Sequence, residues 1–223
     1  MDIPYKAVLF DWDGTLVDTT ALIIEAHNHV RAAFNLPPVQ DKEKAGVIFK
    51  SAREAFPETY GDQAIEAERM FYEYYHAHHK DFLRFFDGAL ELFQTLSKAG
   101  IQIGIVSNKR HDVLGGEIEV SPLKDYIGTF VGAGKAHADK PAPDPLLLAA
   151  ELLDDTLLTA DILYVGDTET DLLCANQCKV DCIYIHHYDI RQDLIDRYHP
   201  VFTAQSLHQI EMWLFGEDEK KAC

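Results

Sequence analysis

The chain has 223 residues, of which 47% are apolar and 26% are charged, as is ordinary for a folded globular protein. This composition excludes a disordered chain, a collagen-like repeat and a small disulfide-stapled domain. The formal net charge of −17, from 20 basic and 37 acidic side chains, disfavours binding to nucleic-acid phosphates and to anionic membranes. We therefore expect no nucleic acid and no membrane as partners, while a local basic pocket for a small anion stays compatible with this charge.

Targeting signals and a disulfide framework are also absent from the sequence pattern. No run of about 18 apolar residues is present that would span a membrane, and the first residues lack the basic and apolar regions of a signal peptide. Cys174, Cys178 and Cys182 lie within nine residues and Cys223 follows later, which is not the spacing of paired cysteines. We expect a reduced, cytoplasmic protein, and the sequence leaves open whether it is a monomer or a homodimer.

Short apolar runs alternate with amphipathic stretches along most of the chain. The apolar runs predict buried strands at residues 7–10, 101–106, 162–165 and 182–185, with a short fifth strand beginning at residue 201. The amphipathic stretches predict helices at residues 89–99, 144–153, 170–177 and 205–214. This alternation predicts an α/β fold, with a Rossmann-like parallel sheet and helices on both of its faces.

One region departs from the alternation, because residues 19–86 contain no convincing strand. Residues 20–34 and 62–80 have helical periodicity, and Leu36-Pro37-Pro38 separates them. We therefore predict an α/β core domain from residues 1–18 and 87–223, with an inserted all-helical domain at residues 19–86.

Polar residues follow three of the predicted strands. Asp11 and Asp13 come after the first, Ser107 after the second and Asp167 after the third. In a parallel sheet, ligands bind beyond the carboxyl ends of the strands, so these side chains are expected to share one site. Ordinary turn chemistry explains a single Asp-Gly or Gly-Asp pair about equally well, but it does not explain three sites in one chain.

The expected neighbours of these carboxylates follow from their charge. Asp11, Asp13 and Asp167 would repel one another by several kcal/mol per pair unless they were protonated or bound a cation. Oxygen ligands without histidine or cysteine beside them favour Mg²⁺. Ser107 could donate its hydroxyl to a phosphate, and Lys140 on a proline-rich loop could neutralise charge, although Lys140 taken alone also fits an exposed loop lysine.

Four segments of the chain carry a resemblance to one enzyme superfamily. In chain order they are Asp11-Trp12-Asp13-Gly14-Thr15-Leu16-Val17-Asp18-Thr19, Ser107-Asn108-Lys109, Lys140-Pro141-Ala142-Pro143-Asp144-Pro145 and Gly166-Asp167-Thr168-Glu169-Thr170-Asp171. Together they resemble the four motifs of the haloacid dehalogenase-like hydrolase superfamily in its phosphatase branch, most closely the phosphoglycolate phosphatase-like members. The resemblance implies that the insert at residues 19–86 is a helical cap domain.

The resemblance also implies a role for each matched carboxylate. Asp11 would be the nucleophile that forms an aspartyl-phosphate, and Asp13 would protonate the leaving alkoxide and later activate water. Asp11, Asp13 through its backbone carbonyl, and Asp167 would hold Mg²⁺. Asp171, the fourth candidate metal residue, would orient metal-bound water or pair with Lys140.

The remaining matched residues would contact the substrate. Ser107 and Lys140 would hold the transferring phosphoryl group, and Thr15 and Asn108 are further candidates for substrate binding. Asp13 separates phosphatases from haloacid dehalogenases, which resemble this fold but lack an acid two residues after the nucleophile and need no metal.

The predicted cap carries weaker signals. Residues 45–53 resemble the specificity loop of the family's cap, in which Lys50 and Arg53 could bind a carboxylate or second phosphate of the substrate. Two solvated helix cations are the alternative interpretation. In the phosphonatase branch a cap lysine forms a Schiff base, and Lys50 is the position to compare.

Two groups of histidines are the last candidates. His76, His78 and His79 favour a solvated helix face over a metal site, because no acidic motif accompanies them. His186 and His187 end a predicted strand and could either neighbour the site or cap the sheet.

The sequence thus predicts a Mg²⁺-dependent phosphatase that hydrolyses a small phosphorylated metabolite, such as a phosphoglycolate-like compound or a sugar phosphate. A phosphomutase or phosphonatase of the same fold is one alternative. A non-catalytic, regulatory protein that binds a phosphorylated ligand is the other.

Overall fold

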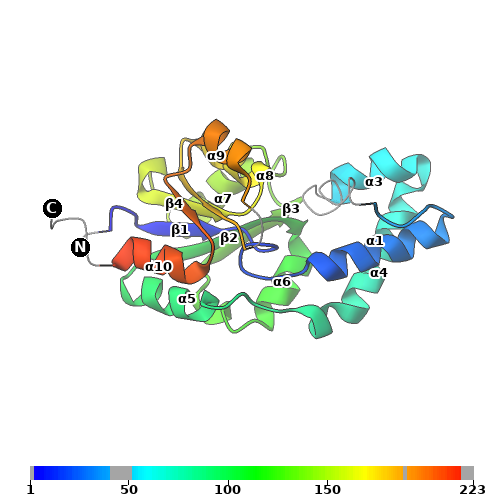
Figure 1. Ribbon diagram of the computed structural model, residues 1–223, viewed down its shortest axis with the longest axis horizontal. Coiled ribbons are helices and arrows are strands. Elements are labelled where there is room, and N and C mark those ends of the chain that lie inside the picture. The colour runs from blue at the N-terminus through cyan, green and yellow to red at the C-terminus, as the bar shows by residue number, and fades with distance from the viewer. Residues whose placement is uncertain (1–2, 41–51, 188–189, 217–223) are drawn as a thin grey trace.

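The computed structural model describes residues 3–40, 52–187 and 190–216. Its centre is a parallel sheet of six strands in the order β3-β2-β1-β4-β5-β6 (Figure 1). The strands are β1 Ala7–Phe10, β2 Gln102–Arg110, β3 Thr129–Ala133, β4 Ile162–Gly166, β5 Asp181–Ile185 and β6 Phe202–Ala204. The predicted Rossmann-like α/β fold is confirmed.

Helices cover both faces of this sheet, and strand β1 shows why. Val8 and Phe10 point to one face, where they join an apolar cluster with α5 (Ala89–Lys98), α6 (His111–Glu119) and α10 (Leu207–Phe215). Ala7 and Leu9 point to the other face and pack with α7 (Asp144–Leu153), α8 (Glu169–Cys178) and α9 (Gln192–Tyr198). Because β1 is fully buried on both sides, all of its residues are apolar.

The register of the sheet brings three chain segments together. Phe10 at the end of β1 pairs with Ile105 of β2 and with Val165 of β4. The residues that follow each strand therefore leave the sheet side by side at one edge. This edge carries the predicted site.

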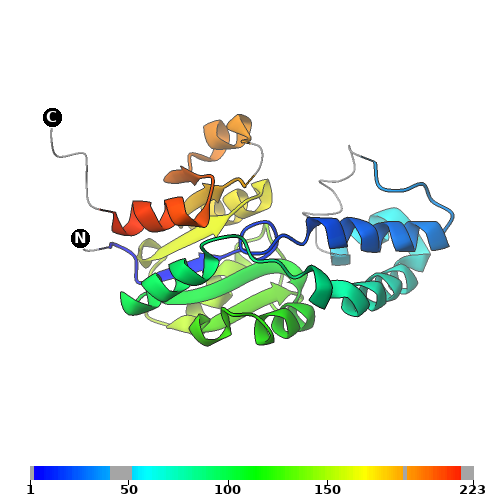
Figure 2. The same cartoon turned by 60° about the horizontal axis from the view of Figure 1, so that its bottom comes forward.

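The region between β1 and α5 contains helices only, within its described part. They are α1 (Thr20–Ala33), α3 (Ala52–Tyr60), the 3₁₀ turn Gly61–Gln63 and α4 (Ala64–Phe82). These helices, which we call the helical insert, lie together at one end of the sheet (Figures 1 and 2). They share an apolar cluster to which Val113 of α6 also belongs, so the insert packs against the core next to the site.

The two chain segments that join the insert to the core, around Val17 and Phe85, lie side by side, and we call them the neck. Val17 forms an antiparallel bridge with Phe85. The amide of Asp18 donates to the carbonyl of Arg84 at 2.9 Å, and the amide of Phe86 donates to the carbonyl of Leu16 at 3.0 Å. The way into the insert and the way out are therefore hydrogen-bonded to each other.

Several elements were not predicted from sequence. Strand β3 lies at the sheet edge, where its glycine and its three half-buried residues leave neither a long apolar run nor an alternation to mark it. Helices α3 and α9 were also not predicted, because they are short. Two further 3₁₀ turns lie at Lys124–Tyr126 and Thr159–Asp161. No helix in the described ranges is both long enough and apolar enough to cross a bilayer.

Gly104 of β2 marks a close approach inside the core. A Cβ added there would lie 2.6 Å from Cδ2 of Leu9 and 3.3 Å from Cδ1 of Leu153. We expect Gly104→Ala to lower the free energy of unfolding by about 1–3 kcal/mol, because the surrounding side chains would be forced off their preferred rotamers.

Gly116 in α6 provides the matched control, because an added Cβ meets no described heavy atom within 4 Å. Gly116→Ala should raise the free energy of unfolding by about 0.5–1 kcal/mol through helix propensity. Urea unfolding followed by circular dichroism measures both variants, and equal stabilities would contradict the expectation.

Candidate active site

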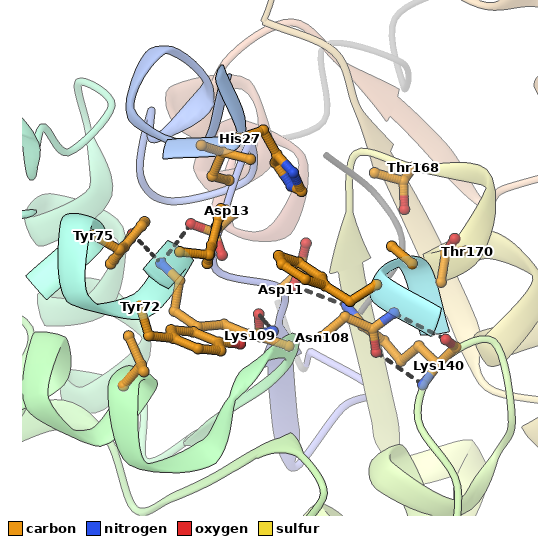
Figure 3. Close-up of a pocket in the computed structure, with 16 residues that line it drawn as sticks. Asp11, Asp13, His27, Tyr72, Tyr75, Asn108, Lys109, Lys140, Thr168 and Thr170 are labelled. Atoms are coloured by element: carbon orange, nitrogen blue, oxygen red, sulfur yellow. Dashed lines mark hydrogen bonds and ion pairs between the residues drawn. The ribbon is translucent and has the colours of Figure 1, made fainter. Parts of the chain in front are cut away.

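The loops after β1 and β4, the C-terminal end of β2 and the loop before α7 meet at a cavity of about 80 Å³ beneath the helical insert (Figure 3). The core side of the cavity is polar, and the insert side is mainly apolar and aromatic. The lining residues are Asp11, Asp13, Ser107, Asn108, Lys109, Lys140, Thr168 and Thr170 on the core side, with Ile23, His27, Ala55, Phe56, Phe71, Tyr72, Tyr75 and Val113 on the insert side.

Lys140 is the centre of one buried network. Its ammonium donates to Oδ1 of Asp11 at 2.8 Å, to Oδ1 of Asp171 at 2.6 Å, to the hydroxyl of Tyr164 at 3.0 Å and to the carbonyl of Val106 at 3.0 Å. Burial lowers the pKa of Lys140, but the charges of Asp11 and Asp171 more than reverse this effect and raise it above its usual value. The ammonium is therefore charged and fixed against Asp11.

Asn108, near the C-terminal end of β2, holds the backbone of Lys140. Its side-chain NH₂ donates to the carbonyl of Lys140 at 2.9 Å, and its side-chain oxygen accepts from the amide of Lys140 at 2.9 Å. Asn108 lines the cavity, but the nitrogen and the oxygen of its side-chain amide are both bonded to the backbone of Lys140. This geometry favours a positioning role over the direct substrate contact expected from sequence.

Asp171 is fully buried and takes four hydrogen bonds. One carboxylate oxygen accepts from Lys140 and Tyr164, and the other accepts from the amide and the hydroxyl of Thr168, at 3.0 Å and 2.6 Å. Thr168 in turn caps the N-terminus of α8. Of the two roles expected for Asp171, this geometry favours pairing with Lys140.

Three carboxylates gather beside this ammonium and could hold a metal ion. One oxygen each from Asp11, Asp167 and Asp171 lies within 4.8 Å of the others. Burial raises the pKa of Asp11 to about 7, against the effect of Lys140. Burial and the charges of Asp11 and Asp171 raise the pKa of Asp167 well above its usual value. One ammonium thus lies among two buried acids and a half-buried one, an arrangement that a bound cation would stabilise.

The loop after β1 is shaped to bring Asp167 close. Gly14 has a φ of +80°, and a Cβ there would lie 2.3 Å from Oδ2 of Asp167, so both the backbone conformation and the space require glycine. The buried hydroxyl of Thr15 donates to Oδ1 of Asp167 at 3.0 Å. Thr15 was expected to bind substrate, and its hydroxyl is instead directed at a candidate metal ligand.

Asp13 lies in a second environment, although only one residue, Trp12, separates it from Asp11. Its Oδ1 accepts from the ammonium of Lys109 at 2.7 Å and from the hydroxyl of Thr19. Burial raises the pKa of Asp13, while Lys109 opposes the shift. Its carboxylate is not among the three that gather as a candidate metal site, so the expected metal contact of Asp13 rests on its backbone carbonyl alone.

Lys109, together with Glu117 of α6, makes this second environment. The Lys109 ammonium also donates to Oε2 of Glu117 at 2.7 Å and to the hydroxyl of Tyr75 at 2.9 Å. Glu117 is completely buried and accepts from the indole of Trp12 at 2.7 Å and from Tyr75 at 2.7 Å. Figure 3 shows Lys109 reaching from the core toward Asp13 and Tyr75.

Ser107 is nearly buried and faces the cavity. Its Oγ accepts from the backbone amide of Lys109 at 3.1 Å, which leaves the hydroxyl hydrogen to donate. Lys50 lies outside the described residues. Arg53 falls within α3, but its side chain lies outside the described part, so the expected substrate contacts of both residues stay predictions.

The histidines fall into different surroundings. His187 stacks on Phe86, with ring centroids 3.5 Å apart, and its Nε2 lies 3.1 Å from the carbonyl oxygen of Thr15. His187 therefore supports the loop that follows β1. His76, His78 and His79 belong to no candidate metal group among the described residues, and Nδ1 of His78 lies 2.8 Å from the carbonyl oxygen of Tyr74.

Sequence reasoning missed several residues of the site. Glu117, Tyr75 and Tyr164 lie in helices and strands that read as ordinary amphipathic or apolar segments. Trp12 and Lys109 were part of recognised segments, but no role was expected for either. The one available signal was Glu117, an acid among the apolar positions of a helix that follows the second strand.

The comparison with a family model decides the family. Residues 8–185 match the model described as haloacid dehalogenase-like hydrolase. This chain belongs to the haloacid dehalogenase-like hydrolase family. It is therefore an enzyme, a hydrolase, and the resemblance of its four motifs is confirmed at this level.

Individual relatives agree with this assignment. Pyrophosphatase PpaX of Bacillus mycoides (strain KBAB4) is 29% identical over 168 residues, which cover 75% of this chain and 77% of the relative. A haloacid dehalogenase-like family hydrolase from Streptococcus pneumoniae superimposes with a TM-score of 0.82 at 21% identity, covering 95% of this chain and 99% of that one. A protein described as a predicted phosphoglycolate phosphatase from Haemophilus somnus superimposes with a TM-score of 0.81 at 19% identity, covering 94% of this chain and 98% of that one. The two solved structures share the fold.

The clamp of Asn108 on Lys140 yields a prediction. Asn108→Ala removes both hydrogen bonds to the Lys140 backbone, so the ammonium should lose its alignment with Asp11. We expect kcat to fall by up to about 100-fold, the effect of a misplacement of roughly 1 Å. Asn108→Asp keeps the acceptor for the Lys140 amide, so its kcat should lie between those of the wild type and Asn108→Ala. Steady-state kinetics of phosphate release measure all three proteins. An Asn108→Ala variant with unchanged kcat would contradict this role.

Proposed function

We propose that this hydrolase is a Mg²⁺-dependent phosphatase that acts on a small phosphorylated metabolite through an aspartyl-phosphate on Asp11. The observation that carries the proposal is that the carboxyl groups of Asp11 and Asp13 line the same cavity and that each is bonded to a different lysine. Asp11 lies against Lys140 at 2.8 Å, and Asp13 lies against Lys109 at 2.7 Å. One acid is thus available for attack on phosphorus and the other for proton transfer.

Asp11 and the groups around it would perform the first half of the reaction. A carboxylate oxygen of Asp11 attacks phosphorus, and the bond to the leaving oxygen breaks with its electron pair staying on that oxygen. Lys140 and the hydroxyl of Ser107 stabilise the charge that develops on the phosphoryl oxygens. Both groups line the cavity beside Asp11.

Asp13 would transfer the protons. Its carboxyl gives a proton to the departing alkoxide, and the resulting carboxylate then takes a proton from the water that attacks the phosphorus of the aspartyl-phosphate. The second step releases phosphate and restores Asp11. A carboxyl group held on the same cavity suits both transfers, because it needs only to reach the oxygen on the far side of phosphorus.

The donor set fits Mg²⁺. Asp11 and Asp167 offer hard carboxylate oxygens close to each other, and the backbone carbonyl of Asp13 would add a third oxygen ligand. When bound, the ion would offset the negative charge of the acids and of the substrate. Asp171 would act through Lys140.

The helices of the insert support the proposed division into a core at residues 1–18 and 87–223 and a cap at residues 19–86. A cap chooses the leaving group by covering the site. Its apolar lining and the small cavity support a small metabolite as substrate. The names of the relatives put pyrophosphate and phosphoglycolate beside sugar phosphates on the panel to be tested.

Location, assembly and the alternative functions belong to the same proposal. We infer a cytoplasmic protein, monomer or homodimer, in which the buried thiols of Cys174 and Cys178 stay reduced. Phosphomutase activity would require a bisphosphate activator. Phosphonatase activity would require a cap lysine such as Lys50, and a regulatory protein would bind a phosphorylated ligand without releasing phosphate.

The nucleophile assignment is tested by Asp11→Asn. Phosphate release should fall on the order of 10⁴-fold or more, because the amide cannot attack phosphorus. Rapid quenching with radiolabelled substrate should trap a labelled protein only when Asp11 is present. Asp155→Asn at an exposed position is the matched control and should behave as wild type. Turnover near the wild-type rate in Asp11→Asn would refute the assignment.

Metal dependence gives a separate test. Treatment with EDTA should abolish phosphate release, and added Mg²⁺ should restore it. Asp167→Asn should raise the Mg²⁺ concentration needed for half-maximal activity by at least about tenfold, since loss of one charged ligand weakens a hard-cation site. Full activity in EDTA would contradict the metal assignment while leaving Asp11 as nucleophile.

A further inference from the structure

Lys109 lies on the active-site cavity, yet its ammonium is fully engaged by the protein. It has three hydrogens to donate, and it has three acceptors: Asp13 at 2.7 Å, Glu117 at 2.7 Å and Tyr75 at 2.9 Å. Its side chain is only 6% exposed. All three hydrogens of the ammonium are thus taken up by side chains of the protein, and one of them goes to Asp13.

Glu117 of α6 fixes the position of the Lys109 ammonium. The carboxylate is completely buried, and its two oxygens accept from Lys109, from the Trp12 indole and from the Tyr75 hydroxyl, each at 2.7 Å. A buried carboxylate without a cation costs several kcal/mol, so Glu117 and Lys109 hold each other in place. Trp12 is itself the residue between Asp11 and Asp13.

Tyr75 brings the helical insert into this network. It lies on α4, whereas the other members lie on the core, and its hydroxyl contacts both Lys109 and Glu117. The insert therefore contributes a polar group to the surroundings of Asp13 in addition to its apolar lining of the cavity.

We propose that Lys109 is a positioning residue that fixes the carboxyl group of Asp13 for proton transfer to the leaving group, and that Glu117 and Tyr75 hold Lys109 for this purpose. The inference rests on the proposed function, because it gives Asp13 the role of acid. It assigns a purpose to three residues whose polar atoms are hydrogen-bonded to one another beside Asp13.

The inference predicts an effect that depends on the leaving group. With ethyl phosphate, the departing alkoxide is strongly basic, so bond cleavage needs the proton from Asp13. With 4-nitrophenyl phosphate, the departing nitrophenolate is stable without a proton. The parameter kcat/KM reports the first half-reaction, in which the leaving group departs, so loss of Lys109 should affect the two esters differently in this parameter.

The variants must keep the buried charges balanced. Lys109→Met alone would leave Glu117 buried without its cation, and the protein could fail to fold for that reason. We therefore compare the double variant Lys109→Met/Glu117→Gln with Glu117→Gln, so that the two proteins differ only at Lys109. Lys124→Met at an exposed position controls for removal of a surface lysine.

We expect the double variant to lose about 100-fold in kcat/KM with ethyl phosphate relative to Glu117→Gln, the usual contribution of a general acid. With 4-nitrophenyl phosphate the loss should stay below about tenfold. Tyr75→Phe should also lose more kcat/KM with ethyl phosphate than with 4-nitrophenyl phosphate, but by a smaller factor. Tyr74→Phe, at the preceding residue of α4, should show no such difference. An equal loss with both esters, or no loss, would overturn the proposal.

A melting-temperature cycle keeps this test separate from the proposed function. Asp13→Asn and Lys109→Met are made singly and together in the Glu117→Gln background. Changes in melting temperature that do not add are expected if Lys109 holds Asp13, and additive changes would overturn the contact. If the wild-type enzyme released no phosphate from either ester, the proposed function would fail, while the cycle would still decide whether Lys109 holds Asp13.

Discussion

The site depends on a concentration of negative charge at the carboxyl ends of the central strands. Asp11, Asp167 and Asp171 are brought together by the register of the sheet, and Lys140 is the ammonium that lies among them. Much of the surrounding structure serves this contact: Asn108 holds the backbone of Lys140, Tyr164 donates to the same oxygen of Asp171 as Lys140, and Thr168 donates to the other oxygen. The core is therefore organised to keep one ammonium beside the proposed nucleophile.

Two acids separated by a single residue have different partners because the chain turns sharply between them. Asp11 continues the line of β1 toward Lys140, while Asp13 is directed toward Lys109 and the helical insert. Gly14 permits the turn that follows, and Trp12 is anchored by Glu117 on the opposite side. Two lysine-centred networks thus separate a proposed nucleophile from a proposed acid within one short loop, which is the general requirement for acid and nucleophile to differ at one pH.

The sequence predicted the parts of this design that are contiguous. The fold class followed from apolar runs such as residues 7–10 and 162–165, and the family followed from polar segments directly after them. What escaped prediction depends on contacts between distant elements: Glu117 reads as one acid in a glycine-containing helix, and Tyr75 as one aromatic residue among many on α4. Their partners are chosen by the packing of α4 on α6, which no local pattern encodes. Strand β3 escaped for a simpler reason, since an edge strand with a glycine has little apolar pattern.

The neck at Val17 and Phe85 has a consequence for how this architecture can vary. The two connecting segments are hydrogen-bonded to each other, so the insert is joined to the core as a loop whose two ends are held together. The entropy of closing a loop grows only with the logarithm of its length, so a longer, shorter or differently folded domain could be grafted at this point at little cost to the sheet. Under the proposed function, the insert that would recognise the substrate is thereby free to diversify while the core that would perform the chemistry stays constant.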